Sequence, residues 1–157
     1  MVELKKRQII KGLKNNLSFK KAAKIIIKNK LLTLIKLINK FNENESVENL
    51  HDLRIAVRRL RYSFELFYDC FPKKVYFDFY NMLENIQDKL GDARDLDVMS
   101  DKLNYFEKNY GILIPDNLHS EMEKKRNEHR TMINKILSEF LSSKLIQKLL
   151  TIKRGDK

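Results

Sequence analysis

Tryptophan is absent from this chain of 157 residues, and cysteine, proline and glycine are scarce, at one, two and four residues. The single cysteine, Cys70, cannot form an internal disulfide, so nothing in the sequence indicates an oxidising compartment. Little proline and glycine together with 43% hydrophobic residues is typical of a helix-rich globular protein and argues against a disordered chain. We expect one domain over residues 1–157.

A long uninterrupted hydrophobic run is also absent. The most apolar stretch, Ile25 to Phe41, contains four lysines and is too broken to span a bilayer. No N-terminal segment combines an apolar region with a small-residue cleavage site, so we expect no secretory signal and a cytoplasmic location.

Acidic residues are nearly missing from the first 40 positions, which hold 12 lysines or arginines and only Glu3 as an acid. The whole net charge of +11 therefore lies there, because bases and acids cancel over residues 41–157. Such a concentrated positive charge favours polyanionic partners, namely nucleic acid, inorganic polyphosphate or an anionic membrane surface. The alternative is that the lysines serve solubility alone.

No strand-like alternation of useful length occurs, and the periodicity predicts an all-α protein, an antiparallel bundle of about six helices with a basic cavity or groove. We expect a short basic helix within residues 1–16, the bundle over residues 18–152 and a frayed tail at residues 153–157. Ser18 and Ser46 are predicted N-caps. Gly91 is predicted to end a helix that begins near Lys73, and Asp92 to cap the next one. The short basic helix is expected to span about Val2 to Lys14. The helix that Ser18 begins is expected to end near Asn39, the helix that Ser46 begins near Phe71-Pro72, and the helix that Asp92 begins near Asn109. A loop is expected at Gly111 and Pro115, followed by a helix from Asp116 or Asn117 to about Phe140 and a last helix that ends near Ile152.

The segment from Asn49 to Phe67 carries the most informative pattern. His51, Arg54, Arg58 and Arg61 would share a helical stripe roughly 80° wide. A second set of side chains with the same period would lie roughly 120° away and face the core: Leu53, Val57, Leu60, Phe64 and Phe67. Like charges at helical spacing repel by a few tenths of a kcal/mol per pair, so the stripe indicates an anion-binding surface. The alternative is a solvated basic face partly neutralised by acids.

Two further basic groups need weighing. Arg94 follows a predicted helix start, where a cation is unfavourable; either it pairs with Asp97 or it binds something outside the helix. Arg126 and Arg130 stack at i, i+4 and require either Glu123 or an anion nearby, although a solvated face explains such a stretch more often. Lys20, Lys24 and Lys28 share one face of the first long helix.

Catalytic and cofactor signals are lacking. His119 and His129 have no partners at metal-ligand spacing, the glycines form no phosphate-binding loop, and no nucleophile–histidine–acid arrangement can be argued. The acids Asp92, Asp95 and Asp97 are better explained by a helix start than by a metal cluster. We therefore expect a binding protein without enzyme activity, metal or cofactor.

The run from His51 to Arg61, HDLRIAVRRLR, followed some thirty residues later by LGDARDLDV at Leu90 to Val98, resembles the CHAD family of conserved-histidine α-helical domains. The similarity covers about Ser18 to Leu103 well and the Arg126/Arg130 helix more loosely. It implies an all-α protein that binds inorganic polyphosphate in a basic channel, with no established enzyme activity. By the motif, the channel would be lined by His51, Arg54, Arg58, Arg61 and Arg94. Arg59 also matches, but its helical angle points away from the stripe.

Family members usually contain two related bundles that face one another, whereas this chain holds roughly one. Two copies could therefore pair about a twofold axis as a homodimer, or a monomer could offer an open groove. We expect lysines 20, 24 and 28 and arginines 126 and 130 to add to the polyphosphate site. The expected role is targeting or scaffolding, with polyphosphate-metabolising enzymes as further partners. The alternatives are nucleic-acid binding, which the lack of aromatics on the basic face disfavours, and histidine phosphotransfer through His51.

Overall fold

The computed structural model describes residue 10 and residues 12–151, and in this part of the chain every regular element is helical. The all-α prediction is confirmed, with five α-helices rather than six. They are α1 (Phe19–Glu43), α2 (Val47–Leu66), a short 3-10 turn η1 (Tyr68–Cys70), α3 (Lys73–Tyr110), α4 (Asp116–Ser142) and α5 (Lys144–Thr151).

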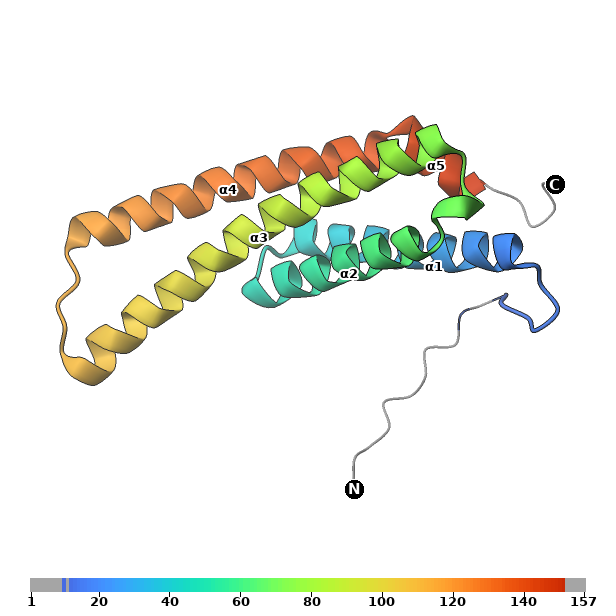
Figure 1. Ribbon diagram of the computed structural model, residues 1–157. Coiled ribbons are helices and arrows are strands. Elements are labelled where there is room, and N and C mark those ends of the chain that lie inside the picture. Colours follow the sequence, from blue (N-terminus) through green and yellow to red (C-terminus); the bar gives the residue numbers. More distant parts are fainter. Residues whose placement is uncertain (1–9, 11, 152–157) are drawn as a thin grey trace, which may run out of the picture.

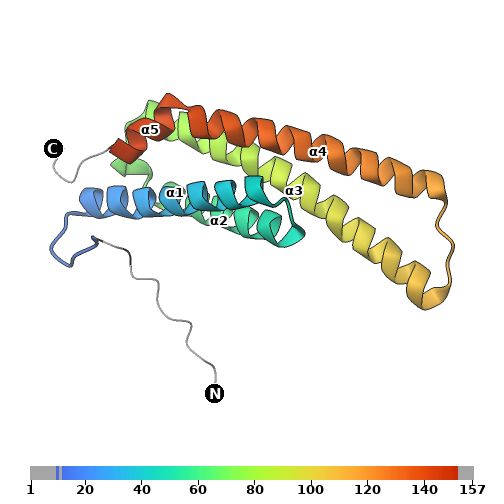
Figure 2. The same cartoon turned by 180° about the vertical axis from the view of Figure 1, so that it is seen from behind.

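The helices form two antiparallel hairpins that lie against each other. α1 packs on α2, and the longer α3 packs on α4; α2 joins the hairpins by packing on α3. Figures 1 and 2 show from both sides that the far end of the α3–α4 hairpin extends beyond the α1–α2 hairpin. The short α5 contacts α1 and α4 near the other end.

Several predicted helix ends are confirmed by their capping contacts. The Ser18 hydroxyl accepts a hydrogen bond from the Lys21 amide at 3.4 Å, and the Ser46 hydroxyl accepts one from the Asn49 amide at 3.2 Å. Both serines thereby satisfy a backbone donor that the first helical turn leaves without a partner. Gly111 ends α3 with a left-handed φ of 63°, a conformation that glycine adopts without steric cost.

The predicted break at Gly91 is wrong. α3 runs through this residue from Lys73 to Tyr110, and Gly91 has no positive φ. The reason is the apolar stripe, which continues without interruption across the predicted break through Phe79, Leu83, Ile86, Leu90 and Ala93. One glycine inside a helix costs about 1 kcal/mol relative to alanine, less than unpacking either half would cost. Asp92 is therefore no N-cap; its carboxylate lies 3.5 Å from the Lys89 ammonium.

The core lies where α1, α2 and α3 meet and is rich in aromatic rings around Phe64. This ring packs on Phe71, Tyr76 and Phe79 with centroid distances of 4.7, 5.0 and 4.8 Å. Such pairs add to the burial free energy of the rings themselves. Cys70 is buried beside them as a small core side chain, and burial raises the pKa of its thiol.

The predicted basic helix at Val2 to Lys14 lies largely outside the described residues. Its described part, residue 10 and residues 12–14, is not helical. The predicted tail at residues 153–157 also lies outside the described part.

The far end of the α3–α4 hairpin is held by a small polar cluster rather than by core packing. Glu107 on α3 forms a 3.0 Å hydrogen bond with His119 on α4 and accepts a 3.2 Å hydrogen bond from the Ile114 amide in the connecting loop. The His119 hydrogen bond holds the pKa of the Glu107 carboxyl below its ordinary value of 4.5; partial burial opposes this, and the Ile114 amide adds to it.

Acidification is therefore expected to loosen this connection. Because the folded state favours the Glu107 carboxylate, its stabilising contribution is complete above pH 4.5 and is lost as the pH falls through the lowered pKa. The amide-exchange protection of Ile114, measured by NMR, should fall between pH 6 and pH 3. Glu107→Ala, which removes the acceptor oxygen, should show the low protection already at pH 6 and no further change. Wild-type protection that stays constant over this range would contradict the assignment.

Candidate functional site

The basic stripe predicted on α2 is present and lies beside a buried apolar face. Burying Leu53, Val57, Leu60 and Phe64 fixes the rotation of the helix about its axis. On the adjoining flank His51 is exposed, whereas the three arginines Arg54, Arg58 and Arg61 are half-buried. The stripe is therefore no freely solvated face.

Arg61 attaches this flank of α2 to α3. Its Nε lies 3.3 Å from Glu65 Oε1 on its own helix, and its Nη1 lies 3.9 Å from Glu84 Oε1 on α3. Its guanidinium also lies 5.4 Å from the centre of the Tyr80 ring and 5.6 Å from that of Tyr62. Arg61 thus has internal partners, both acidic and aromatic.

Arg54, Arg58 and Arg94 differ from Arg61, because none of them forms an ion pair with the described residues. Arg54 Nε and Arg94 Nη1 are buried without a hydrogen-bond partner, and so is Gln87 Oε1. Arg61 Nε also lacks a hydrogen bond, but it has the Glu65 carboxylate at 3.3 Å. A buried donor without a partner costs about 1–3 kcal/mol, more when it is charged. The sequence left two possibilities for Arg94, pairing with Asp97 or binding something outside the helix. The structure does not have the Asp97 pair.

The register of the two helices brings these side chains to one seam. α2 and α3 run antiparallel (Figure 1), and Arg61 meets Glu84 across them. Arg54 precedes Arg61 by seven residues on α2, and Gly91 follows Glu84 by seven residues on α3. Because the helices are antiparallel, Arg54 and Gly91 both lie about 10.5 Å from the Arg61–Glu84 contact in the same direction, and hence at the same level. Arg94 lies on the same face of α3, within about 80° of Glu84. We call Arg54, Arg58, Arg61 and Arg94 the arginine seam.

The predicted lysine stripe on α1 lies elsewhere. Lys40 faces α2, since its ammonium lies 3.9 Å from Asp52 Oδ2. Lys40 and Asp52 mark the sides on which α1 and α2 face each other. Around α1, the three lysines at positions 20, 24 and 28 lie roughly 120–200° from Lys40. Around α2, Arg54 lies about 160° from Asp52. The lysines are thus on the flank of α1 away from α2, and the arginine seam is on the flank of α2 away from α1. The fold does not bring the two groups together.

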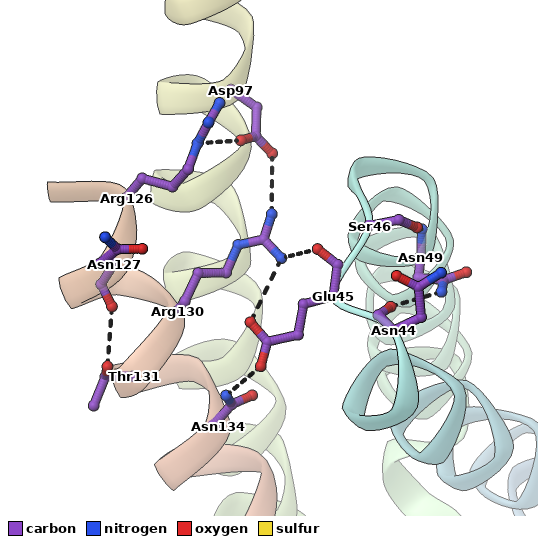
Figure 3. Close-up of polar contacts among 10 residues, drawn as sticks. All are labelled: Asn44, Glu45, Ser46, Asn49, Asp97, Arg126, Asn127, Arg130, Thr131 and Asn134. Carbon is purple, nitrogen blue, oxygen red and sulfur yellow. Dashed lines mark hydrogen bonds and ion pairs between the residues drawn. The ribbon is translucent and has the colours of Figure 1, made fainter. Parts of the chain in front are cut away.

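Arg126 and Arg130 on α4 are paired with acidic residues. Arg126 Nε lies 3.2 Å from Asp97 Oδ1, and its Nη1 lies 3.3 Å from Glu123 Oε2. Arg130 Nη2 lies 3.9 Å from Asp97 Oδ2, and its Nη1 lies 3.9 Å from Glu45 Oε2 (Figure 3). These two arginines therefore carry internal counter-charges that Arg54, Arg58 and Arg94 lack.

Asp97 is the residue whose role sequence reasoning missed. It is 1% exposed and connects α3 to α4, while Arg130 and Asn134 continue the network to Glu45 in the α1–α2 connection. The prediction assigned Asp97 to a helix start. The available signal was its spacing, because Leu90, Ala93 and Asp97 follow one another at i, i+3, i+7 and place an acid on the buried stripe.

The arrangement offers guanidinium groups that can donate hydrogen bonds to an anion. Among residues 10 and 12–151, no three histidine, cysteine, aspartate or glutamate side chains gather where they could hold a metal ion. None of the described helices combines the length and the apolar character needed to cross a membrane. A hollow of about 1080 Å³ lies along an exposed face of α4, at residues such as Ser120, Lys124 and Asn127, and includes none of the arginine seam.

Comparison with known families supports the resemblance seen in the motifs. The model of the CHAD domain matches residues 4–104, which is more than half of the chain. The chain belongs to the CHAD family. No curated protein and no solved structure matches it.

The extent of the CHAD match separates the two groups of arginines. The matched segment contains α1, α2 and α3 up to residue 104, and hence the whole arginine seam and Asp97. Arg126 and Arg130 lie beyond it, on α4. The LGDARDLDV segment therefore has residues in two different sites. Arg94 belongs to the arginine seam, whereas Asp97 forms ion pairs with arginines of α4.

Proposed function

We propose that this CHAD protein binds inorganic polyphosphate along the arginine seam, and that the flank between α2 and α3 is its basic groove. The observation that carries the proposal is the pair of buried guanidinium nitrogens, on Arg54 and Arg94, that have no partner among the described residues. Their cost to folding is offset when an anion accepts their hydrogen bonds. Family membership supports the same ligand, since CHAD domains are associated with polyphosphate.

The chemistry of the seam suits a phosphate polymer. Guanidinium groups donate paired hydrogen bonds to phosphate oxygens and remain charged at every physiological pH. From His51 to Arg61 the stripe extends about 15 Å along α2, so a linear chain could contact several cations in turn. His51 at its exposed end adds a ring N–H donor.

Single-stranded nucleic acid is the competing ligand. Proteins that bind it offer aromatic rings on which bases stack. The two rings at the seam, Tyr62 and Tyr80, both lie against the Arg61 guanidinium. We therefore propose polyphosphate as the preferred ligand and nucleic acid as the weaker one.

Binding is expected to weaken steeply with salt. Contacts between cations and a polyanion release counterions, so the logarithm of the association constant should fall linearly with the logarithm of salt concentration. Fluorescence anisotropy with labelled long-chain polyphosphate, between about 50 and 200 mM salt, measures this slope. A single-stranded oligonucleotide of equal charge should displace the polymer poorly. Equal displacement would favour the nucleic-acid function, and absence of polyphosphate binding at low salt would contradict the proposal.

The proposed role is targeting or scaffolding without enzyme activity, with polyphosphate-metabolising enzymes as partners. A second copy of the chain is a further proposed partner, because two related bundles usually face one another across the channel in this family and a second copy could supply the facing bundle. Sedimentation velocity of the same complexes tests this. A single chain per short polyphosphate, at micromolar protein, would contradict the homodimer and leave an open groove on the monomer.

A further inference from the structure

Gly91 lies in the interior of a long helix for no reason that helix geometry supplies. It is neither a helix end nor a residue with positive φ, the two circumstances in which glycine is commonly required. Alanine at this position would favour the helix, since glycine costs conformational entropy there. A structural role of Gly91 would therefore have to come from packing.

Packing supplies no reason either. A Cβ atom built on Gly91 meets no heavy atom of a neighbouring element or side chain within 4 Å. Close approach of two helices, the usual cause of a glycine on a helix surface, is therefore not what excludes a side chain. Gly91 lies within about 20° of Glu84 around α3, and Leu90 beside it is fully buried, so the open space lies on the side of Glu84 and not in the core.

The open space lies among polar atoms that lack partners. Gly91 is at the level of Arg54 across the seam, as the Arg61–Glu84 contact sets the register. On α3 its neighbours one turn before and one turn after are Gln87 and Arg94 on one side and the exposed Asp88 and Asp95 on the other. Arg54 Nε, Gln87 Oε1 and Arg94 Nη1 are all buried without hydrogen-bond partners. Two helices thus place unpaired polar groups at the level of a stretch of backbone that has no side chain.

We propose that Gly91 is the floor of the ligand site, where a linear phosphate chain lies directly against the α3 backbone between Arg54 and Arg94. This inference rests on the proposed function and makes it more specific. A side chain at position 91 would fill the space that the phosphate oxygens need in order to reach both guanidinium groups.

The test is a graded series at position 91, Gly91→Ala and Gly91→Leu, with Asn85→Leu as the matched control. Asn85 lies on the exposed side of α3, about 120° around the helix from Gly91. Asn85→Leu therefore introduces the same leucine side chain outside the seam. All three variants should fold, and Gly91→Ala should raise the Tm by about 3 °C through its helix propensity. Polyphosphate affinity should fall modestly in Gly91→Ala and at least tenfold in Gly91→Leu, while Asn85→Leu binds as wild type does.

The outcomes separate this inference from the function beneath it. If Gly91→Leu is folded and binds polyphosphate with wild-type affinity, Gly91 is not the floor of the site, whereas salt-sensitive binding by the wild type would still uphold the polyphosphate function. If Gly91→Leu and Asn85→Leu weaken binding equally, the effect is general and the inference is also overturned. If wild type itself fails to bind, the proposed function fails first.

Discussion

Replacing Arg54 and Arg58 together by alanine is expected to weaken polyphosphate binding about 100-fold without destabilising the protein. Each charge-assisted hydrogen bond contributes about 1.5 kcal/mol or more, and two such losses amount to about 3 kcal/mol, or two powers of ten. The slope of the salt dependence should decrease by about two, one for each phosphate contact removed. Anisotropy titrations across a salt series measure both quantities.

The Tm of the same double variant should equal or exceed that of the wild type. Without ligand, Arg54 carries a buried donor that lacks a partner, and its removal relieves that cost. Alanine also favours the helix at least as well as arginine does. Loss of binding together with unchanged or higher stability is typical of a site whose residues are arranged for a ligand rather than for folding.

The matched control removes two positive charges elsewhere. Arg59 lies on α2, on the flank that faces away from the seam, and Lys36 is exposed on α1; neither forms an ion pair among the described residues. Arg59→Ala with Lys36→Ala lowers the net charge equally. If this control weakens binding as much as the Arg54/Arg58 variant does, the net field of the protein binds the polymer, and the seam is not a site.

Asp97→Asn is expected to lower the free energy of unfolding by about 3 kcal/mol. The substitution keeps the shape of the side chain but removes the charge that faces Arg126 at 3.2 Å and Arg130 at 3.9 Å. Breaking a buried pair by removing one partner costs about 3–5 kcal/mol, because the remaining charge stays buried. Glu45 still accompanies Arg130, and Glu123 still accompanies Arg126, which is partly exposed, so the expected loss lies at the lower end. Urea unfolding measures the free energy, and the Tm should fall by about 9 °C.

Asp92→Asn is the control for this prediction. It makes the same chemical change five residues earlier on α3, where Asp92 is exposed and lies 3.5 Å from the Lys89 ammonium. Exposed pairs contribute about 0–1 kcal/mol, so this variant should stay close to wild type. Similar losses in the two variants would mean that Asp97 is no buried connection between α3 and α4. Folded Asp97→Asn should keep its polyphosphate affinity, since Asp97 does not lie in the seam.

Local spacing was enough to predict much of this protein. The hydroxyl side chains of Ser18 and Ser46 begin α1 and α2 as predicted, and Gly111 ends α3, because caps depend on residues within one turn. The basic stripe on α2 was predictable for the same reason: the apolar positions on one helix set its rotation, and the adjoining flank follows. The family followed from two motifs that the comparison confirms.

The sequence by itself determined that the chain is helical, where most helices begin and end, and that Arg54, Arg58 and Arg61 share a flank. Only the tertiary structure decided which of the cations keep free hydrogen-bonding groups. Asp97 neutralises Arg126 and Arg130 across two helices, the lysines of α1 lie on a separate flank, and α3 continues through Gly91 because packing outweighs its low helix propensity. The physical reason is range: capping and periodicity act within a turn or two, whereas charge pairing across a seam depends on the register and rotation of helices far apart in the chain.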